Sequence, residues 1–266
     1  MKLYERDFST LTADEEREWE ILKKQEIVHE TSGIKITRSL FHDYPKAVRH
    51  YISLFPNHYL DIVDLKDEPR LRAMLRAFRE LLDTAGLTER DILNFIKTNQ
   101  AYFIVGGLLK AHFHFGHHDV HLFPEFALGT SFKADYLLAG RNSDGWHLVL
   151  VELEAPNGQI TLESGELGAA FRKGLAQASD WDAWLEAHYG LLTEVFEKHR
   201  NKREPLPSEF HLLDKTRIHY VVIAGRRADF GDKTYRERRK KSPTEMLLHY
   251  DNLADAAEQV IGAATY

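Results

Sequence analysis

Cysteine is absent from this chain of 266 residues, so disulfide bonds, thiolate zinc sites and cysteine nucleophiles are excluded. Long hydrophobic runs are missing as well. The longest, AYFIVGGLL, is too short to span a bilayer, and the first residues, MKLYERDFSTLTADEE, lack the apolar region of a signal peptide. A Walker loop and a GxGxxG motif after a strand are also absent, which argues against a nucleotide cofactor. We therefore expect a cytoplasmic protein without a membrane partner.

An excess of positive charge is lacking too, since the formal net charge is −6 with 43% hydrophobic and 29% charged residues. This is the composition of a globular protein, and it argues against one that coats nucleic acid through bulk positive charge. The segment 215–241 is the exception, because it is basic. A solvated loop is the simpler interpretation of such a run, and contact with phosphates is the alternative. The candidate phosphate contacts are Arg226, Arg227, Arg238, Arg239 and Lys240.

The N-terminal third has helical signals. A capping-box pattern at Thr12 opens a charged helix, and DEPRLRAMLRAFRELLDTAG places Pro69 near a helix start and Gly86 just past its end. Another helix is expected from Thr88. These segments predict a mainly helical N-terminal lobe.

From about Leu108 the apolar period changes to that of strands. FHFGHHDVHLFPEFALGTSFKADYLLAG and WHLVLVELEAP read as strands, and RIHYVVIAG as a later buried strand. Between them we expect a long helix from about Thr161 to His188, and a final helix capped at Asp251. Strands alternating with helices in this way predict an α/β fold, with a mixed sheet flanked by helices.

The strand HLVLVELEAPNGQ ends in two acids. Side chains alternate along a strand, so Glu152 and Glu154 share one face, about 7 Å apart. Asp135 and Lys133 share a face of the preceding strand, and GRNSDG can join the two strands as an antiparallel pair. If the strands are neighbours, three carboxylates converge on one place, which suits a hard cation such as Mg²⁺.

An acid, two strands, an acid-x-(Lys or Glu) motif and then a helix bearing glutamine form the pattern of the PD-(D/E)XK nuclease superfamily. Asp135, Glu152 and Glu154 match its core, and Gln177 matches the helix glutamine. With FPEFALGTSFKADYLL, VELEAPNGQ, LAQASDWDAWLE, YVVIAGR and LLHYDNL in that order, the chain resembles the C-terminal nuclease domain of Shedu antiphage proteins. The resemblance implies a nuclease domain over residues 88–266, after a regulatory or oligomerisation region over residues 1–87.

One position departs from the superfamily, which usually has lysine where this chain has Glu154. Lys133 on the neighbouring strand, or Lys173 or Arg172 in the following helix, are the alternative sources of positive charge. Glu125, in FPEF, resembles an acid often contributed ahead of the first core strand, which makes it a candidate metal ligand beside Asp135 and Glu152.

The resemblance implies a Mg²⁺-dependent DNA endonuclease or nickase of a Shedu-type defence system, with Mn²⁺ able to substitute. It also implies a homo-oligomer, a tetramer by family likeness. The alternative is a nucleic-acid-binding or sensing module that keeps the fold but has lost efficient hydrolysis with the lysine. A glycosidase using Glu152 and Glu154 is a weaker hypothesis, because adjacent acids on one strand are poorly placed to flank a sugar bond.

Two other features have structural explanations. Trp181 and Trp184 follow Gln177 at helical spacing, which is typical of core residues rather than of a base-stacking platform. His112 and His114, in HFHFGHHDVH, would share a strand face and could bind zinc or copper. Alternating Phe113 and Phe115 already account for that segment as a half-buried strand.

Overall fold

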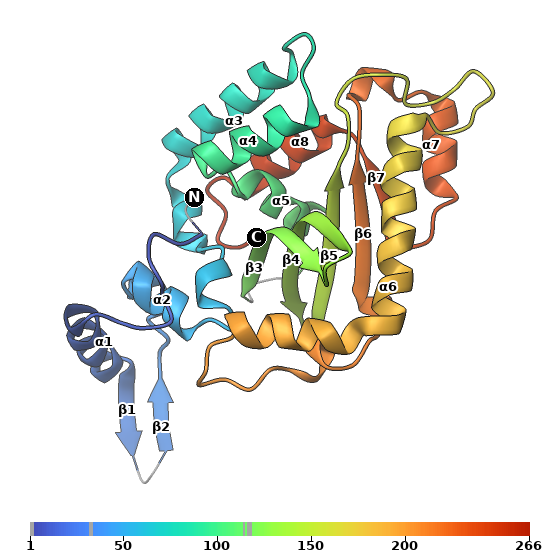
Figure 1. Ribbon diagram of the computed structural model, residues 1–266. Coiled ribbons are helices and arrows are strands. Elements are labelled where there is room, and N and C mark those ends of the chain that lie inside the picture. The colour runs from blue at the N-terminus through green and yellow to red at the C-terminus, as the bar shows by residue number, and fades with distance from the viewer. Residues whose placement is uncertain (1–2, 32–33, 114, 116–118) are drawn as a thin grey trace.

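A five-stranded mixed sheet forms the centre of the protein, as a computed structural model shows (Figure 1). The structure describes residues 3–31, 34–113, 115 and 119–266. The strands lie in the order β3-β4-β5-β6-β7. Their bounds are Val120–Leu128 for β3, Phe132–Asn142 for β4, Gly145–Leu153 for β5, Ile218–Ile223 for β6 and Glu245–Leu248 for β7.

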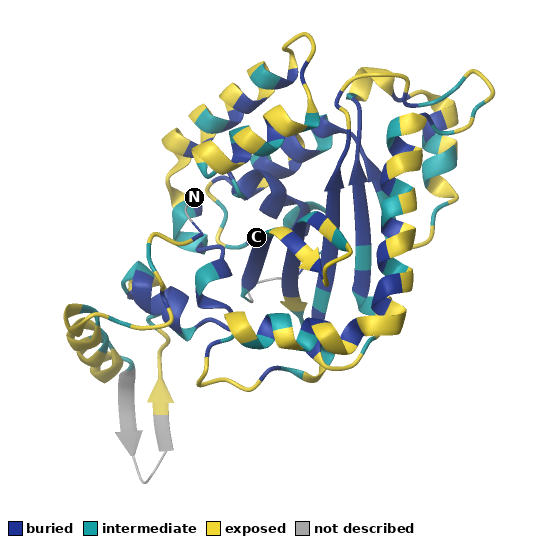
Figure 2. Cartoon of the chain, viewed as in Figure 1, coloured by how far each residue is buried: buried dark blue, intermediate teal, exposed yellow. Residues whose placement is uncertain are grey.

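The first three strands form an antiparallel meander, and the last two join it in parallel. Asn142 pairs with Gly145, so the predicted turn between β4 and β5 is confirmed. Leu148 pairs with Ile218, which makes β5 the strand where the sheet changes from antiparallel to parallel. In Figure 2 the strands are almost wholly dark blue, which marks the sheet as the buried layer of the fold.

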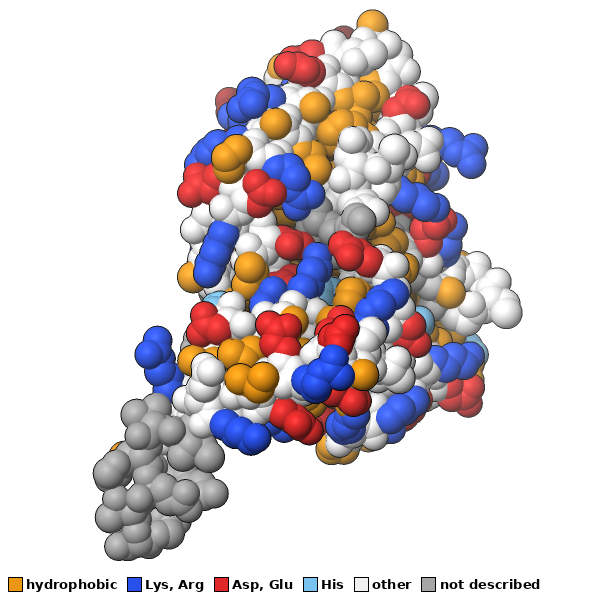
Figure 3. Space-filling view, turned by 90° about the vertical axis from the view of Figure 1, so that its left-hand side faces the viewer, with side chains coloured by type: hydrophobic (Ala, Val, Ile, Leu, Met, Phe, Trp, Pro, Cys, Tyr) orange, Lys and Arg blue, Asp and Glu red, His pale blue; other side chains and the backbone are white. Residues whose placement is uncertain are grey.

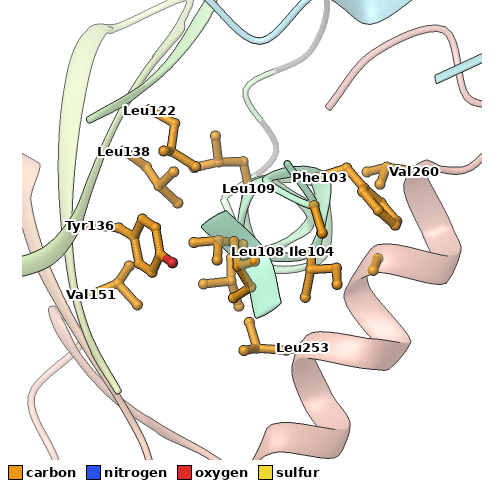
Figure 4. Close-up of a cluster of buried hydrophobic side chains, with 14 of the residues drawn as sticks. Phe103, Ile104, Leu108, Leu109, Leu122, Tyr136, Leu138, Val151, Leu253 and Val260 are labelled. Atoms are coloured by element: carbon orange, nitrogen blue, oxygen red, sulfur yellow. The ribbon is translucent and has the colours of Figure 1, made fainter. Parts of the chain in front are cut away.

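Four helices cover one face of the sheet: α3 Glu68–Leu82, α4 Glu89–Asn99, α5 Phe103–His112 and α8 Tyr250–Val260. Figure 4 shows Leu108 of α5 between the strand residue Tyr136 and Leu253 of α8, with Leu109 beside Leu122 and Leu138 of the strands. A Cβ at Gly107 would lie 2.7 Å from the backbone of α8, so α5 and α8 pack closely because this residue has no side chain.

The opposite face of the sheet is covered by α6, Ala169–His199. Its first part runs beside the strands and its second part turns across their lower ends in Figure 1. The turn lies at His188, whose backbone is not helical (φ −135°, ψ 17°). Trp181 and Trp184 are buried in the core beneath α6, as the helical spacing predicted.

The remaining helices and strands are α1 Ala13–Gln25, β1 Ile27–Thr31, β2 Ile34–Thr37, α2 Lys46–Ile52 and α7 Asp232–Arg239. Short 3₁₀ turns lie at Phe41–Asp43, Pro56–His58, Ile62–Lys66, Ser208–Phe210, Lys215–Arg217 and Arg227–Asp229. Among the described residues, no helix is both long and apolar enough to cross a membrane.

The predicted mixed α/β sheet with flanking helices is confirmed, and so are the capped helices at Thr12 and Thr88. Several boundaries differ. The long helix begins at Ala169 rather than near Thr161, because residues 155–168 form a loop closed by the bridge between Thr161 and Leu167. The final helix is capped by His249, not Asp251. The basic segment contains α7 instead of being a loop throughout, and β1 with β2 adds a hairpin to the helical N-terminal region.

The strand expected from His112 to Phe115 is wrong at His112, because α5 extends to that residue and β3 begins only at Val120. The run before it, AYFIVGGLLK, contains most of α5, which is buried and therefore apolar on nearly all sides. Hydrophobic periodicity cannot distinguish such a buried helix from a strand. His114, the second candidate zinc or copper ligand, lies outside the described residues. The division at residue 87 stays a prediction.

Candidate active site

The β4–β5 hairpin brings Asp135 and Glu152 together. Tyr136 pairs with Val151 in the antiparallel register, so Asp135 on β4 lies beside Glu152 on β5. Asp135 Oδ2 accepts a hydrogen bond from the backbone N–H of Leu153, at 2.8 Å, which fixes the carboxylate against β5. On β5, Val149 and Val151 face the core under α5, so Glu152 points to the face that α6 covers.

Both carboxyl groups hold protons more tightly than free acids do. Burial raises the pKa of Asp135 to about 6, and the charges of Glu89 and Glu154 add to this effect. Burial raises the pKa of Glu152 to about 8, with further contributions from Asp135 and Glu154. Glu152 is 5% exposed, and its Oε2 has no hydrogen-bond partner among the described residues. In the described part of the chain, no lysine or arginine forms an ion pair with either carboxylate.

Glu154 lies just past the end of β5 and is held by two helices, α6 and α8. Its Oε2 accepts a hydrogen bond from Lys173 Nζ of α6, at 2.8 Å. The Tyr250 hydroxyl of α8 donates to its backbone carbonyl, at 2.6 Å. Gly174 allows α6 to approach, since a Cβ there would lie 3.2 Å from Glu154 Cγ and 2.4 Å from Val222 Cγ1. Burial raises the pKa of Glu154, and Lys173 opposes that rise.

Gln177 stands one helical turn beyond Lys173, so both side chains lie on the face of α6 that meets the site. A hydrogen bond from Gln177 lowers the pKa of Glu152 against the larger effect of burial. The Gln177 Oε1 atom is buried without a hydrogen-bond partner among the described residues. Of the predicted site residues, the structure thus brings Asp135, Glu152, Glu154 and Gln177 together.

Glu125 and Lys133 instead bond to each other. Lys133 Nζ donates to Glu125 Oε1 at 2.9 Å, and Lys97 Nζ lies 3.8 Å from Glu125 Oε2. Glu125 has a left-handed backbone (φ 50°) and is exposed. The positive charge of Lys133 lowers the pKa of Asp135 against the larger effect of burial, but Lys133 forms no ion pair with it in the described part of the chain.

Glu89 is the acid that the sequence analysis missed. It lies in the first turn of α4, and its charge raises the pKa of Asp135, Glu152 and Glu154, in each case after burial. Its Oε2 is 3.9 Å from Lys173 Nζ. The sequence predicted a helix from Thr88, but sequence spacing could not show that the helix start meets the end of β5.

A cleft of about 640 Å³ opens beside these residues. It lies between the start of α4, the loop after β5 and the first turns of α6. Its lining includes Glu89, Glu154, Lys173, Asn157, Gln159 and Ala170. Asn157 ties the loop to the start of α4 through a 2.9 Å hydrogen bond to the Leu87 carbonyl. Of the buried acids, Glu154 lines this cleft, which is a space that a substrate can enter.

The acids suit a divalent cation with few protein ligands. No group of three His, Asp or Glu in the described ranges lies close enough together to hold a metal. Asp135 and Glu152 are adjacent, and the free Oε2 of Glu152 is an available oxygen ligand. Mg²⁺ commonly takes one or two carboxylates and keeps several waters, so this pair fits it.

Two arginines of the basic segment form ion pairs with other parts of the fold, whereas its other candidate phosphate contacts lie at the end of α7. Arg226 bonds to Asp251 at 2.9 Å and to Asp83 at 3.0 Å, and Arg227 pairs with Asp255, so both link parts of the fold. Arg238, Arg239 and Lys240 lie at the end of α7, where Lys240 pairs with Glu237. The face of the molecule in Figure 3 carries acidic and basic side chains intermixed rather than one positive surface.

The sequence was compared with known proteins. It matches the family described as Shedu protein SduA, C-terminal, over residues 86–253. No curated protein matches the chain. The matched range contains Glu89, the two strands that carry Asp135 and Glu152, and the α6 residues Lys173 and Gln177, so the resemblance inferred from the motifs is confirmed.

Proposed function

The chain belongs to the Shedu SduA C-terminal family, which points to antiphage defence, and we propose that it is a metal-dependent DNA endonuclease or nickase. One observation carries the proposal. Asp135 and Glu152 are adjacent and buried without an ion-pair partner among the described residues, and Glu154, whose charge raises the pKa of both, lines an open cleft. Buried acids of this kind destabilise a fold unless a ligand uses them, so they mark a functional site.

The reaction we propose is hydrolysis of a phosphodiester bond. Water adds to phosphorus, the bond from phosphorus to the 3′ oxygen breaks, and the proton that the water loses is taken up by the departing oxygen. Asp135 and Glu152 would hold Mg²⁺ or Mn²⁺. Such a cation supplies charge stabilisation at the phosphate and lowers the pKa of water. Gln177, which bonds to Glu152, keeps that carboxylate in position against the sheet.

We assign to α7 the contacts with those DNA phosphates that lie further from the acids. Residues 232–241, DKTYRERRKK, contain six basic and two acidic side chains. Lys233, Arg236 and Lys240 line a second cleft, of about 390 Å³, with the loop residues Ser164 and Glu166. The loop 155–168 thus has the acid-lined cleft on one side and basic side chains on the other. This arrangement supports a nucleic-acid backbone lying across the loop.

The test is cleavage of supercoiled, linear and free-ended DNA with Mg²⁺, Mn²⁺ or EDTA. We expect metal-dependent nicking or cutting that falls by a factor on the order of 100 in Asp135→Asn and Glu152→Gln. Glu18→Gln, at an exposed acid of α1 that lines neither cleft, is the matched control and should keep the activity. DNA binding without cleavage, unchanged in both variants, would identify the non-catalytic sensing module instead. A homo-oligomer, which family membership implies, is a further proposal that sedimentation measurements test.

A further inference from the structure

Lys173 bonds to one of the buried acids and is itself exposed to solvent. Its Nζ bonds to Glu154 Oε2 at 2.8 Å, and its side chain is 61% exposed whereas that of Glu154 is 3% exposed. No other lysine or arginine in the described part of the chain forms a hydrogen bond or ion pair with Asp135, Glu152 or Glu154. The positive charge that bonds to one of these acids therefore comes from α6.

The contact with Glu154 leaves most of the ammonium group available. A lysine has three N–H donors, and Glu154 takes one of them. Glu89 Oε2, at 3.9 Å, is beyond hydrogen-bond distance and adds only electrostatic attraction. Two donors remain on the side of the cleft. Ala169 and Ala170, which line the same cleft one turn earlier, are too small to block a ligand from reaching them.

The position of Lys173 is also well fixed at its base. Phe171, two residues before it, is buried in the core beside Val222, and Gly174 lies against the same strand. The lysine therefore extends from a rigid helix turn, with its end held by Glu154, toward the cleft. A phosphate in the cleft can reach the ammonium without breaking the ion pair.

We propose that Lys173 is a substrate-binding residue, which holds a backbone phosphate of the DNA strand in the cleft next to Asp135 and Glu152. The inference rests on the proposed function, because it assumes that the ligand is DNA. The superfamily usually has a lysine on the strand where this chain has Glu154. We place the corresponding positive charge on α6. The ion pair with Glu154 anchors the lysine for this role.

The experiment measures binding of a fluorescent DNA duplex by anisotropy, in EDTA and in Ca²⁺, over a range of salt concentrations. Lys173→Met should weaken binding about tenfold and reduce the slope of log affinity against log salt by about 0.9, the value for one phosphate contact. Lys173→Arg should retain most of the affinity. Lys215→Met removes a half-exposed lysine that pairs with Asp182 of α6 away from the cleft, and should leave both quantities unchanged.

Glu154→Gln separates phosphate binding from a structural role of the ion pair. The glutamine removes a negative charge near the phosphate, so this variant should bind DNA as well as the wild type or more tightly. A merely structural pair would make Lys173→Met and Glu154→Gln weaken binding alike, with matching losses of thermal stability. That result, or unchanged binding in Lys173→Met, would overturn the proposal. Binding is measured without cleavage, so a protein that binds through Lys173 but cuts no DNA would refute only the nuclease function.

Discussion

Asp135 and Glu152 show how single residues connect folding to function. Each is buried beside another acid, and burial raises the pKa of both groups. A chain selected for stability alone would place apolar or hydrogen-bonded side chains there. The surrounding residues hold this unfavourable pair in place. Leu153 donates to Asp135, and Tyr250 fixes the backbone of Glu154.

Tyr250→Phe tests whether that backbone contact positions the site. The tyrosine is fully buried, and its loss leaves the Glu154 carbonyl without this donor, so we expect the free energy of unfolding to fall by about 1–2 kcal/mol. Cleavage should fall as well. Tyr189→Phe is the matched control, because its hydroxyl donates to the Glu209 carbonyl far from the acids. It should lose similar stability in urea titrations but keep its activity, and equal activity in the two variants would contradict a positioning role.

At the scale of elements, α6 combines packing with the presentation of site residues. Its Trp181 and Leu185 pack against the sheet, while Lys173 and Gln177 meet the acids. Both functions require the helix to lie close to β5 and β6 at its first turns. Gly174 permits this approach, because any side chain there would overlap Val222.

Gly174→Ala should therefore be unfavourable although alanine favours helices. The added Cβ would meet Val222 Cγ1 at 2.4 Å, and we expect a loss of about 1–3 kcal/mol in the free energy of unfolding, with reduced cleavage. In Gly190→Ala, on the same helix, the added Cβ meets nothing within 4 Å. That variant should be neutral or up to about 1 kcal/mol more stable. Chemical denaturation of the two proteins measures the difference, and equal stabilities would show that α6 can shift freely.

Helix α7 carries the second element-scale prediction. Arg236 and Arg239 are exposed, so reversing both charges, as Arg236→Glu with Arg239→Glu, should weaken DNA binding by more than tenfold at low salt, and less at high salt. Arg70→Glu with Arg76→Glu, on the exposed side of α3, changes the net charge by the same amount and is the control. Anisotropy titrations compare the variants. If this α3 double variant weakens binding as much as the α7 variant does, the effect reflects total charge and not a contact by α7.

At the scale of the whole molecule, the sequence predicted local features better than their assembly. Alternation along VELE placed Glu152 and Glu154 on one face, and the GRNSDG turn implied that Asp135 would join them. Neither signal could show that Lys173 bonds to Glu154, because that contact depends on how α6 crosses the sheet. Glu89 was missed for the same reason. Glu125 lies near Asp135 in the sequence pattern, but its left-handed backbone and Lys133 hold it at the surface.

The response of the whole fold to pH should be set partly by buried histidines. Burial lowers the pKa of His58 to about 3, and its contact with His199 at 3.0 Å adds to the effect. Burial also lowers the pKa of His50 and His219 to about 4. The unfolded chain binds these protons below about pH 6.5 while the folded chain does not. These histidines should therefore lower the stability as pH drops from 6.5 toward 4.

Urea titrations from pH 8 to pH 4.5 measure this loss, which should reach about 1.4 kcal/mol per pH unit for each such histidine. His58→Gln should flatten the profile by that amount, whereas His211→Gln, at an exposed position, should not. Asp135 and Glu152 act in the opposite direction, since their raised pKa values remove stability as pH increases. The comparison of variants isolates the histidine contribution, and an unchanged slope in His58→Gln would contradict it.

The most direct test of the metal centre counts the Mn²⁺ ions that each chain binds, from the loss of the free-ion signal in electron paramagnetic resonance. We expect the wild type to bind at least one Mn²⁺ per chain. Asp135→Asn and Glu152→Gln should abolish that binding, and Glu125→Gln, which changes an acid bonded to Lys133, should retain it. Binding that persists in both Asp135→Asn and Glu152→Gln, or a wild type that binds no Mn²⁺, would contradict a metal centre at these acids.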